Sequence, residues 1–292
     1  MKIDSSFINA PFKEYTVKIN WRNMKNYAAA IGDNNPYYFD DEREKGIVAH
    51  PMYVVSVTWP IIENIKEFIQ KEDFPLKLFN RIIHYSEHII LYQLLRPGNQ
   101  LRIKGSIAAI LPHRAGTQII QRFDAINKNN ELIFTEYIGG IFRGVKCKGE
   151  AKGKENIPKI PEFNPESEKI WSNSIHIDQL RTYIYDGCAD IHFPAHTSKK
   201  FAHFVGLPGI ILQGTATLAY AIKEIVNKEA NGNPHSVKQI ACKFTGMVIP
   251  GTDIQINLLG KKEKKEAIEL FFDVQNHQKK TAIRQGYVLL KK

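Results

Sequence analysis

The sequence has few cysteines and no long apolar segment. Its three cysteines, Cys147, Cys188 and Cys242, are too few and too unpatterned for a disulfide framework or a metal site. The first residues, MKIDSSFINA, lack the apolar core of a signal peptide, and the longest uncharged apolar run, 51–62, is too short to cross a bilayer. We therefore expect a cytoplasmic protein without a membrane span.

Several common catalytic motifs are absent as well. The chain contains no G-x-S-x-G nucleophile motif, no P-loop and no dinucleotide-binding fingerprint. His84, His88 and His113 fall in strand-like regions without the spacing of metal ligands. We expect neither a metal nor a cofactor.

Acidic residues are outnumbered by basic ones, which gives a formal net charge of +10. The lysines are scattered, and their densest run, GKKEKKE at 260–266, separates two strand-like segments, as in a solvated hairpin. This pattern argues against a nucleic-acid partner. A basic surface would suit a phosphate-rich small molecule such as coenzyme A.

The chain divides into two halves that resemble each other. Residues 146–168 have the Lys-, Gly-, Pro- and Glu-rich composition of a linker. We expect one domain over 1–148, a linker over 149–164 and a second domain over 165–292. Three landmark residues of the first half recur in the same order in the second. The pairs are Pro36 and Pro194, Pro97 and Pro250, and Gly140 and Gly286, and their separations decrease slowly from 158 to 153 to 146 residues.

Both halves also share one order of elements. Short amphipathic helices are expected at 21–32 and 177–188, and long apolar helices at about 51–71 and 213–228. Pro60 should kink or break the first long helix. Strand-like segments follow at 81–95, 99–111, 116–127 and 131–143, and again at 237–248, 252–260, 266–275 and 281–290. Each half is therefore predicted to be an α+β unit in which an antiparallel sheet wraps one buried helix.

Two related loops carry the chemistry. The first half has GDNNPYYFDD at 32–41, and the second has ADIHFPAHTS at 189–198. Two places after its proline, the first loop has Tyr38, whereas the second has His196. Together with the segment down to IILQG, these loops resemble the MaoC-like or (R)-specific enoyl-CoA hydratase family in its double hot-dog form. The resemblance covers nearly the whole chain and implies that the two halves pair their sheets.

The resemblance implies a hydratase or dehydratase (a hydro-lyase of fatty acid metabolism) that interconverts trans-2-enoyl and (R)-3-hydroxyacyl thioesters. His196 would be the base, Asp190 would orient it or share the water, and the amide of Gly214 would hold the thioester oxygen. Coenzyme A or an acyl carrier enters only as part of the substrate. Substrate contacts are expected from Phe193, Gln213, Lys199, Lys200 and Arg143.

Some features depart from the family pattern. Phe193 replaces the family's Asn, and Asp190 precedes His196 by six residues rather than five. Either the loop bulges by one residue, or Asp190 faces away from the site. A solvated loop histidine remains the alternative role for His196.

In the first half, Pro51 aligns with Gly214 and has no N–H to donate, so that half lacks both the base and the amide. Asp33 and Asn35 would only fix the loop. Two further functions stay open, namely a hot-dog thioesterase and a non-catalytic acyl-thioester-binding subunit. The sequence also leaves a homodimer open.

Overall fold

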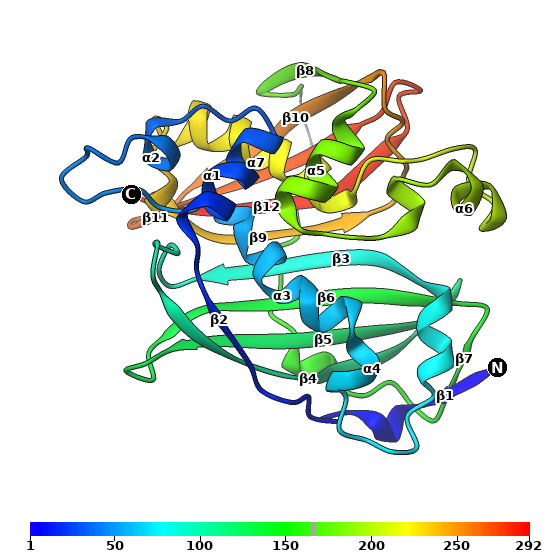
Figure 1. Cartoon of the computed structure of the whole chain (residues 1–292). Helices are drawn as coiled ribbons and strands as arrows, with labels where there is room; N and C mark the ends of the chain where they lie inside the picture. The colour runs from blue at the N-terminus through cyan, green and yellow to red at the C-terminus, as the bar shows by residue number, and fades with distance from the viewer. Residues whose placement is uncertain (165–167) are drawn as a thin grey trace.

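The two halves build one continuous antiparallel sheet. The computed structural model describes residues 1–164 and 168–292, so the expected start of the second domain at residue 165 lies outside the described residues. Ten strands follow one another across the sheet in the order β2-β4-β5-β6-β3-β9-β12-β11-β10-β8 (Figure 1). The first half supplies β2 (Tyr15–Lys18), β3 (Ile82–Leu91), β4 (Gln100–His113), β5 (Gly116–Asn127) and β6 (Leu132–Arg143). The second supplies β8 (Trp171–Ile177), β9 (Val237–Phe244), β10 (Thr252–Glu263), β11 (Ala267–Gln275) and β12 (Thr281–Lys291).

One long helix is buried against each half of the sheet. In the second half it is α7 (Gly214–Glu229), whose first turns carry small buried residues, Ala216, Ala219 and Ala221, that allow close packing. In the first half, the single helix expected over 51–71 is divided into the 3₁₀ helix η2 (Pro51–Tyr53), α3 (Val54–Glu63) and α4 (Ile65–Phe68). α3 runs through Pro60 and ends three residues later at Glu63, although proline removes one helical N–H and crowds the turn before it. This architecture confirms two hot-dog halves.

Shorter elements connect and edge these units. The remaining α-helices are α1 (Trp21–Ala30), α2 (Pro36–Phe39), α5 (Arg181–Ala189) and α6 (Lys199–Phe204). The 3₁₀ helices are η1 (Ser5–Phe7), η3 (Leu76–Arg81), η4 (Lys154–Asn156), η5 (Pro194–His196) and η6 (Pro234–Ser236). A separate parallel pair joins β1 (Lys2–Asp4) to β7 (Lys146–Lys148). Among the described residues, no helix combines the length and the apolar character needed to cross a membrane.

The halves meet at β3 and β9 and at α1 and α5. Antiparallel pairing runs from Ser86 opposite Lys243 to Ile90 opposite Gln239. Beside this seam, the hydroxyls of Tyr27 on α1 and Tyr185 on α5 lie 2.9 Å apart, and both rings are buried. These tyrosines are 158 residues apart, the same separation as Pro36 and Pro194. Equivalent positions therefore face each other across the contact between the halves.

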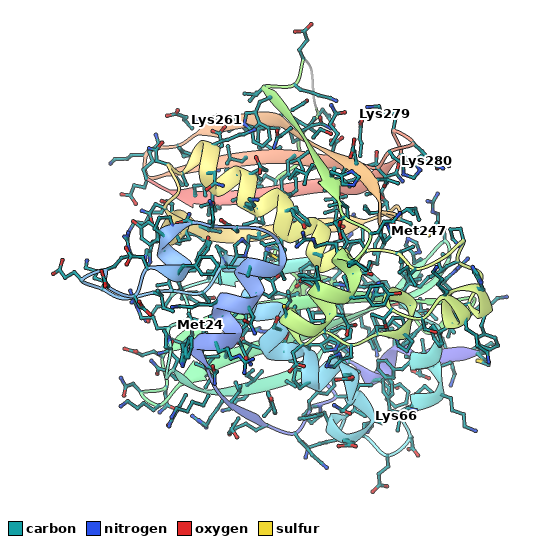
Figure 2. The ribbon with its side chains drawn as sticks, turned by 45° about the horizontal axis from the view of Figure 1, so that its top comes forward. Met24, Lys66, Met247, Lys261, Lys279 and Lys280 are labelled. Atoms are coloured by element: carbon teal, nitrogen blue, oxygen red, sulfur yellow. The ribbon has the colours of Figure 1, made fainter. Side chains whose placement is uncertain are left out.

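Linker and charged segments lie on the outside of this core. Residues 149–164 run across the sheet, where Asn156 donates to the Ala108 carbonyl at 3.2 Å and Phe163 stacks on Phe271 at 4.5 Å. The expected hairpin at 260–266 is confirmed, since the Lys264 N–H bonds to the Ala267 carbonyl between β10 and β11. Lys261, Lys279 and Lys280 lie at the periphery of the second half, and Lys66 lies at the opposite end of the molecule (Figure 2). The basic charge is thus distributed, as the sequence suggested.

Two glutamates are buried at the seam between the halves. Glu87 on β3 and Glu136 on β6 are almost fully buried, and Thr58 of α3 lies beside Glu136. Burial raises the pKa of both carboxyls, and the charge of Glu87 raises the pKa of Glu136 further. The raised pKa favours the protonated form of each carboxyl in the folded chain.

We expect Glu136→Gln to stabilise the fold increasingly as the pH rises. A carboxyl with a raised folded pKa favours folding fully below its unfolded pKa of about 4.3 and loses this contribution as the pH climbs through the folded pKa. Glutamine has no proton to lose. The expected gain at about pH 8 is on the order of 1–3 kcal/mol, with a smaller difference at about pH 5. Urea melts of both proteins at the two pH values measure it, and a pH-independent difference would contradict the assignment.

Candidate active site

His196 sits at the end of η5, on the loop that follows α5. Its Nδ1–H donates to the Ile211 carbonyl at 2.8 Å, since that oxygen can only accept. The bond fixes the tautomer and leaves Nε2 with a free lone pair. Burial lowers the pKa of His196, while the Ile211 bond and the charge of Asp186 act in the opposite direction. The ring is thus neutral and basic near pH 7.

Gly214 begins the buried helix α7 three residues after Ile211, so one short segment joins the base to the helix start. The N-cap residue Gln213 makes no side-chain capping bond, which leaves first-turn N–H groups without an acceptor among the described residues. The helix dipole makes this end positive. A Cβ at position 214 would lie 3.0–3.3 Å from ring atoms of Phe244, so the close approach of that ring favours glycine.

The first half also reaches this site. His84 on β3 lies against Phe244, with ring centroids 4.6 Å apart, and its positive form would lower the pKa of His196. The Nε2 of His84 lies 3.2 Å from both the Ser86 carbonyl and Glu87 Oε2. Burial lowers the pKa of His84 to about 4, so it is neutral near pH 7. The sequence offered no signal for this proximity, because it depends on the pairing of β3 with β9.

The structure does not bring Asp190 to His196. Asp190 caps the C-terminal end of α5 with φ 55°, and its carboxylate is exposed and bonded to His192 Nε2 at 2.9 Å. Gly32, which lies 158 residues earlier, has φ 60° at the end of α1. Asp190 therefore occupies the place of this turn glycine. The residue equivalent to Asp33 is the buried Ile191.

The other predicted contact residues have different surroundings. Phe193 is 41% exposed, with its ring 5.9 Å from that of His196, whereas Gln213 is buried and donates to the Thr182 carbonyl at 3.1 Å. Lys199 and Lys200 are exposed at the start of α6, directly after the loop of His196. Arg143 is exposed at the end of β6, and no contact ties it to His196.

The equivalent loop of the first half is closed. Asp33 and Asn35 accept bonds from the backbone N–H groups of Asn35 and Tyr37, which confirms their loop-fixing role. Tyr38 is buried against His50, with ring centroids 5.4 Å apart, and burial lowers the pKa of His50 to about 3. Pro51 opens η2, as expected for a helix start that donates no N–H.

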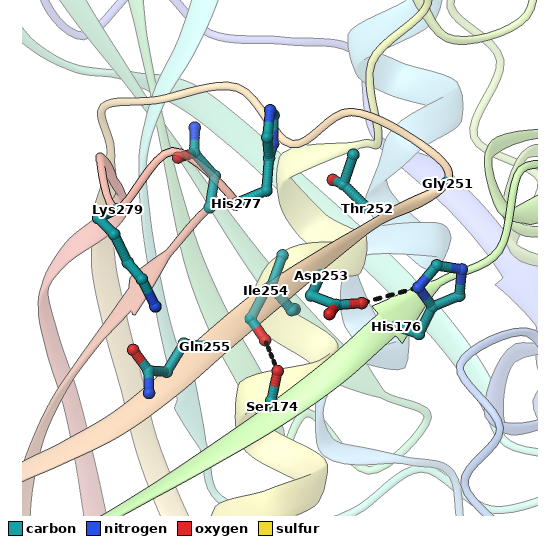
Figure 3. A pocket seen from close by; sticks show the side chains of 10 residues that line it. Ser174, His176, Gly251, Thr252, Asp253, Ile254, Gln255, His277 and Lys279 are labelled. Atoms are coloured by element: carbon teal, nitrogen blue, oxygen red, sulfur yellow. Dashed lines mark hydrogen bonds and ion pairs between the residues drawn. The ribbon is translucent and has the colours of Figure 1, made fainter.

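Two surface hollows lie away from His196 and Gly214. One, of about 380 Å³, is lined by β8 and β10 and by the turn before β12, and it contains an exposed pair of His176 and Asp253 at 2.7 Å (Figure 3). The other, of about 290 Å³, lies around Tyr92 and His235. Within the described residues, no three His, Cys, Asp or Glu side chains group as metal ligands. Neither hollow is lined by His196 or Gly214.

Family models match both halves of the chain. A model described as a MaoC like domain matches residues 165–280. A second, described as FAS1-like, dehydratase domain region, matches residues 6–136. The two matches together cover most of the chain and divide it at the linker.

Curated relatives point the same way. The chain is 22% identical over 184 residues to the peroxisomal multifunctional enzyme type 2 of Drosophila melanogaster, covering 62% of this chain and 30% of that protein. It is 30% identical over 95 residues to the peroxisomal enoyl-CoA hydratase 2 of Arabidopsis thaliana, covering 32% of this chain and 29% of that protein. The matches span less than a third of the length of either relative.

Solved structures extend the likeness over the whole fold. A MaoC-like dehydratase from Phytophthora capsici superposes with a TM-score of 0.83, at 19% identity and with 98% of each chain covered. At this identity the likeness establishes the fold, and the two family models add the sequence signature. The second half therefore matches a MaoC-like domain, the first half matches a FAS1-like dehydratase region, and the whole chain has the double hot-dog fold of MaoC-like proteins.

Proposed function

We infer that the chain is an acyl-thioester hydratase or dehydratase that acts on trans-2-enoyl and (R)-3-hydroxyacyl thioesters. One observation carries the inference: a histidine with a free Nε2 lies one short segment away from an uncapped helix start. Hydration of an enoyl thioester needs these two groups, a base for water and a donor for the developing oxyanion. The second half supplies both.

The proposed reaction keeps its protons in balance. His196 Nε2 takes a proton from water as the water oxygen bonds to C3 of the substrate. The electrons move to the thioester oxygen, where the Gly214 N–H and the positive end of α7 stabilise the enolate. The imidazolium then returns its proton to C2 and the thioester is left intact. Dehydration follows the same steps in reverse.

Recognition of the substrate is proposed from the surroundings of the loop. Phe193 would contact the acyl group, and Lys199 and Lys200 would meet phosphates of a coenzyme A thioester at the mouth of the site. Gln213 would hold the helix start from within the fold through its bond to Thr182. Arg143, at the end of β6, would be a further phosphate contact. No separate cofactor enters this scheme, and we also propose a cytoplasmic location and a homodimer.

Crotonyl-CoA and its 3-hydroxy product test this proposal. The pure protein should remove enoyl absorbance without releasing thiol, and it should restore that absorbance from the 3-hydroxy compound. Release of thiol would instead identify a thioesterase, in which water attacks the carbonyl carbon. Binding without either reaction, repeated with longer acyl chains, would identify a non-catalytic binding subunit.

A further inference from the structure

Two carboxylates and one histidine form a chain at the end of α5. His192 is half exposed, and its Nδ1 lies 3.0 Å from Asp186 Oδ2, while its Nε2 lies 2.9 Å from Asp190 Oδ1. The two aspartates are one helical turn apart but differ in exposure, because the side chain of Asp190 is 69% exposed and that of Asp186 only 17%. Asp186 is therefore the inward-facing member of the pair.

The two oxygens of Asp186 have different surroundings. Oδ2 is bonded to His192, whereas Oδ1 is buried and has no hydrogen-bond partner among the described residues. A buried carboxylate oxygen without a partner is costly, and natural folds keep few such groups without a reason. Asp186 lies outside the loop motif, so no sequence pattern singles it out.

The internal repeat indicates that Asp186 lies near His196. At the offset of 158 residues, Asp186 corresponds to Ala28 and His196 to Tyr38. In the first half, Ala28 and Tyr38 belong to one small buried cluster. In the first half the methyl group of Ala28 packs against the phenol of Tyr38. At the corresponding place in the second half, the carboxylate of Asp186 stands on the side of the His196 imidazole. The charge of Asp186 also raises the pKa of His196.

We propose that Asp186, and not Asp190, is the carboxylate that works with His196, as a positioning residue that stabilises the imidazolium form of the base. This proposal rests on the proposed function. When Nε2 takes a proton from water, the ring becomes positive inside the fold, where an unpaired charge is unfavourable. The negative Asp186 offsets that charge until the proton returns to C2.

Other groups near His196 do not fill this role. The Ile211 carbonyl holds Nδ1–H but carries no full charge, and His84 on β3 opposes protonation of His196. His192 balances part of the Asp186 charge when protonated, and its own pKa is raised, first by its bond to Asp186. Of the groups that act on His196, Asp186 is the one that supplies negative charge.

A matched pair of variants tests the proposal. Asp186→Asn and Asp190→Asn each remove one carboxylate bonded to the same histidine and keep the side-chain size. We expect Asp186→Asn to lower kcat by about 10²-fold, at the lower end of general acid–base effects. It should also move the acid limb of kcat/KM to lower pH, because His196 loses a charge that favours its protonated form. Asp190→Asn should stay within about two-fold of the wild type, with an unmoved profile.

Titration of His196 by NMR provides a readout that does not need activity. Its pKa should fall in Asp186→Asn and stay unchanged in Asp190→Asn. If Asp186→Asn folds poorly, Asp186→Ala replaces it, since alanine is the residue that the first half carries at this place. An unchanged His196 pKa in the Asp186 variants, or a larger loss of rate in Asp190→Asn, would overturn the proposal. If the wild type and His196→Ala are equally inactive while the pKa shift is present, the proposed function fails instead.

Discussion

Replacing His196 with alanine is expected to reduce hydration of crotonyl-CoA by about 10²–10⁴-fold, the range for loss of a general base. Its Nδ1 is committed to the Ile211 carbonyl, three residues before the start of α7, and its Nε2 keeps a free lone pair. The measurement is kcat/KM near pH 7 under conditions where the fold is intact. A thermal melt accompanies it, because the lost bond to Ile211 costs about 1 kcal/mol of stability.

Tyr38→Phe is the matched control, since Tyr38 holds the same position in the first half. The Tyr38 hydroxyl is buried and has no hydrogen-bond partner among the described residues, so its removal should leave both fold and rate nearly unchanged. Equal losses in the two variants, or a greater loss in Tyr38→Phe, would show that the halves do not differ as we describe.

Gly214→Pro should fold and should slow kcat by about 10²–10³-fold, the effect of losing one oxyanion donor. Proline removes the N–H while suiting the first position of a helix, as Pro51 does at the start of η2. Gln213, with φ −56° and ψ 137°, has the extended backbone that a residue before proline prefers. The effect belongs in kcat, because the hydrogen bond strengthens as negative charge develops.

Gly214→Ala separates the lost donor from the added bulk. Both variants place a Cβ at 3.0–3.3 Å from the Phe244 ring, but alanine keeps its N–H. We expect alanine to cost only the packing adjustment and to turn over much faster than proline. If the proline variant melts normally and turns over like alanine, the oxyanion is held elsewhere.

The architecture could be predicted because it depends on local and repeated signals. Apolar periodicity, turn residues and the repeated landmarks gave the order of elements, and the resemblance to the double hot-dog family implied the pairing of the two halves. The edge strands were not predicted. β2 is short, and β8 lies just before the start of a helix. Pro60 was expected to kink or break the helix over 51–71, whereas α3 continues through Pro60 and the chain divides after Tyr53 and at Asn64.

Candidate site residues could be named where they are close in sequence. His196 and Gly214 stand on one stretch of chain, so one motif named both as candidates. Asp190 matched the motif by residue type, yet at the constant offset of 158 residues it corresponds to the turn residue Gly32 and not to Asp33, and its carboxylate points outward. His84 could not be predicted, because only the three-dimensional pairing of β3 with β9 brings it to Phe244.

The proposed hydration is tested most directly by tracing the oxygen atom of water into the product. The wild-type chain would be incubated with crotonyl-CoA in ¹⁸O-labelled water and the products separated by mass spectrometry. We predict one labelled oxygen on C3 of an intact 3-hydroxyacyl thioester, because His196 directs water to the double bond. Label in a free carboxylate, with the thioester cleaved, would contradict it.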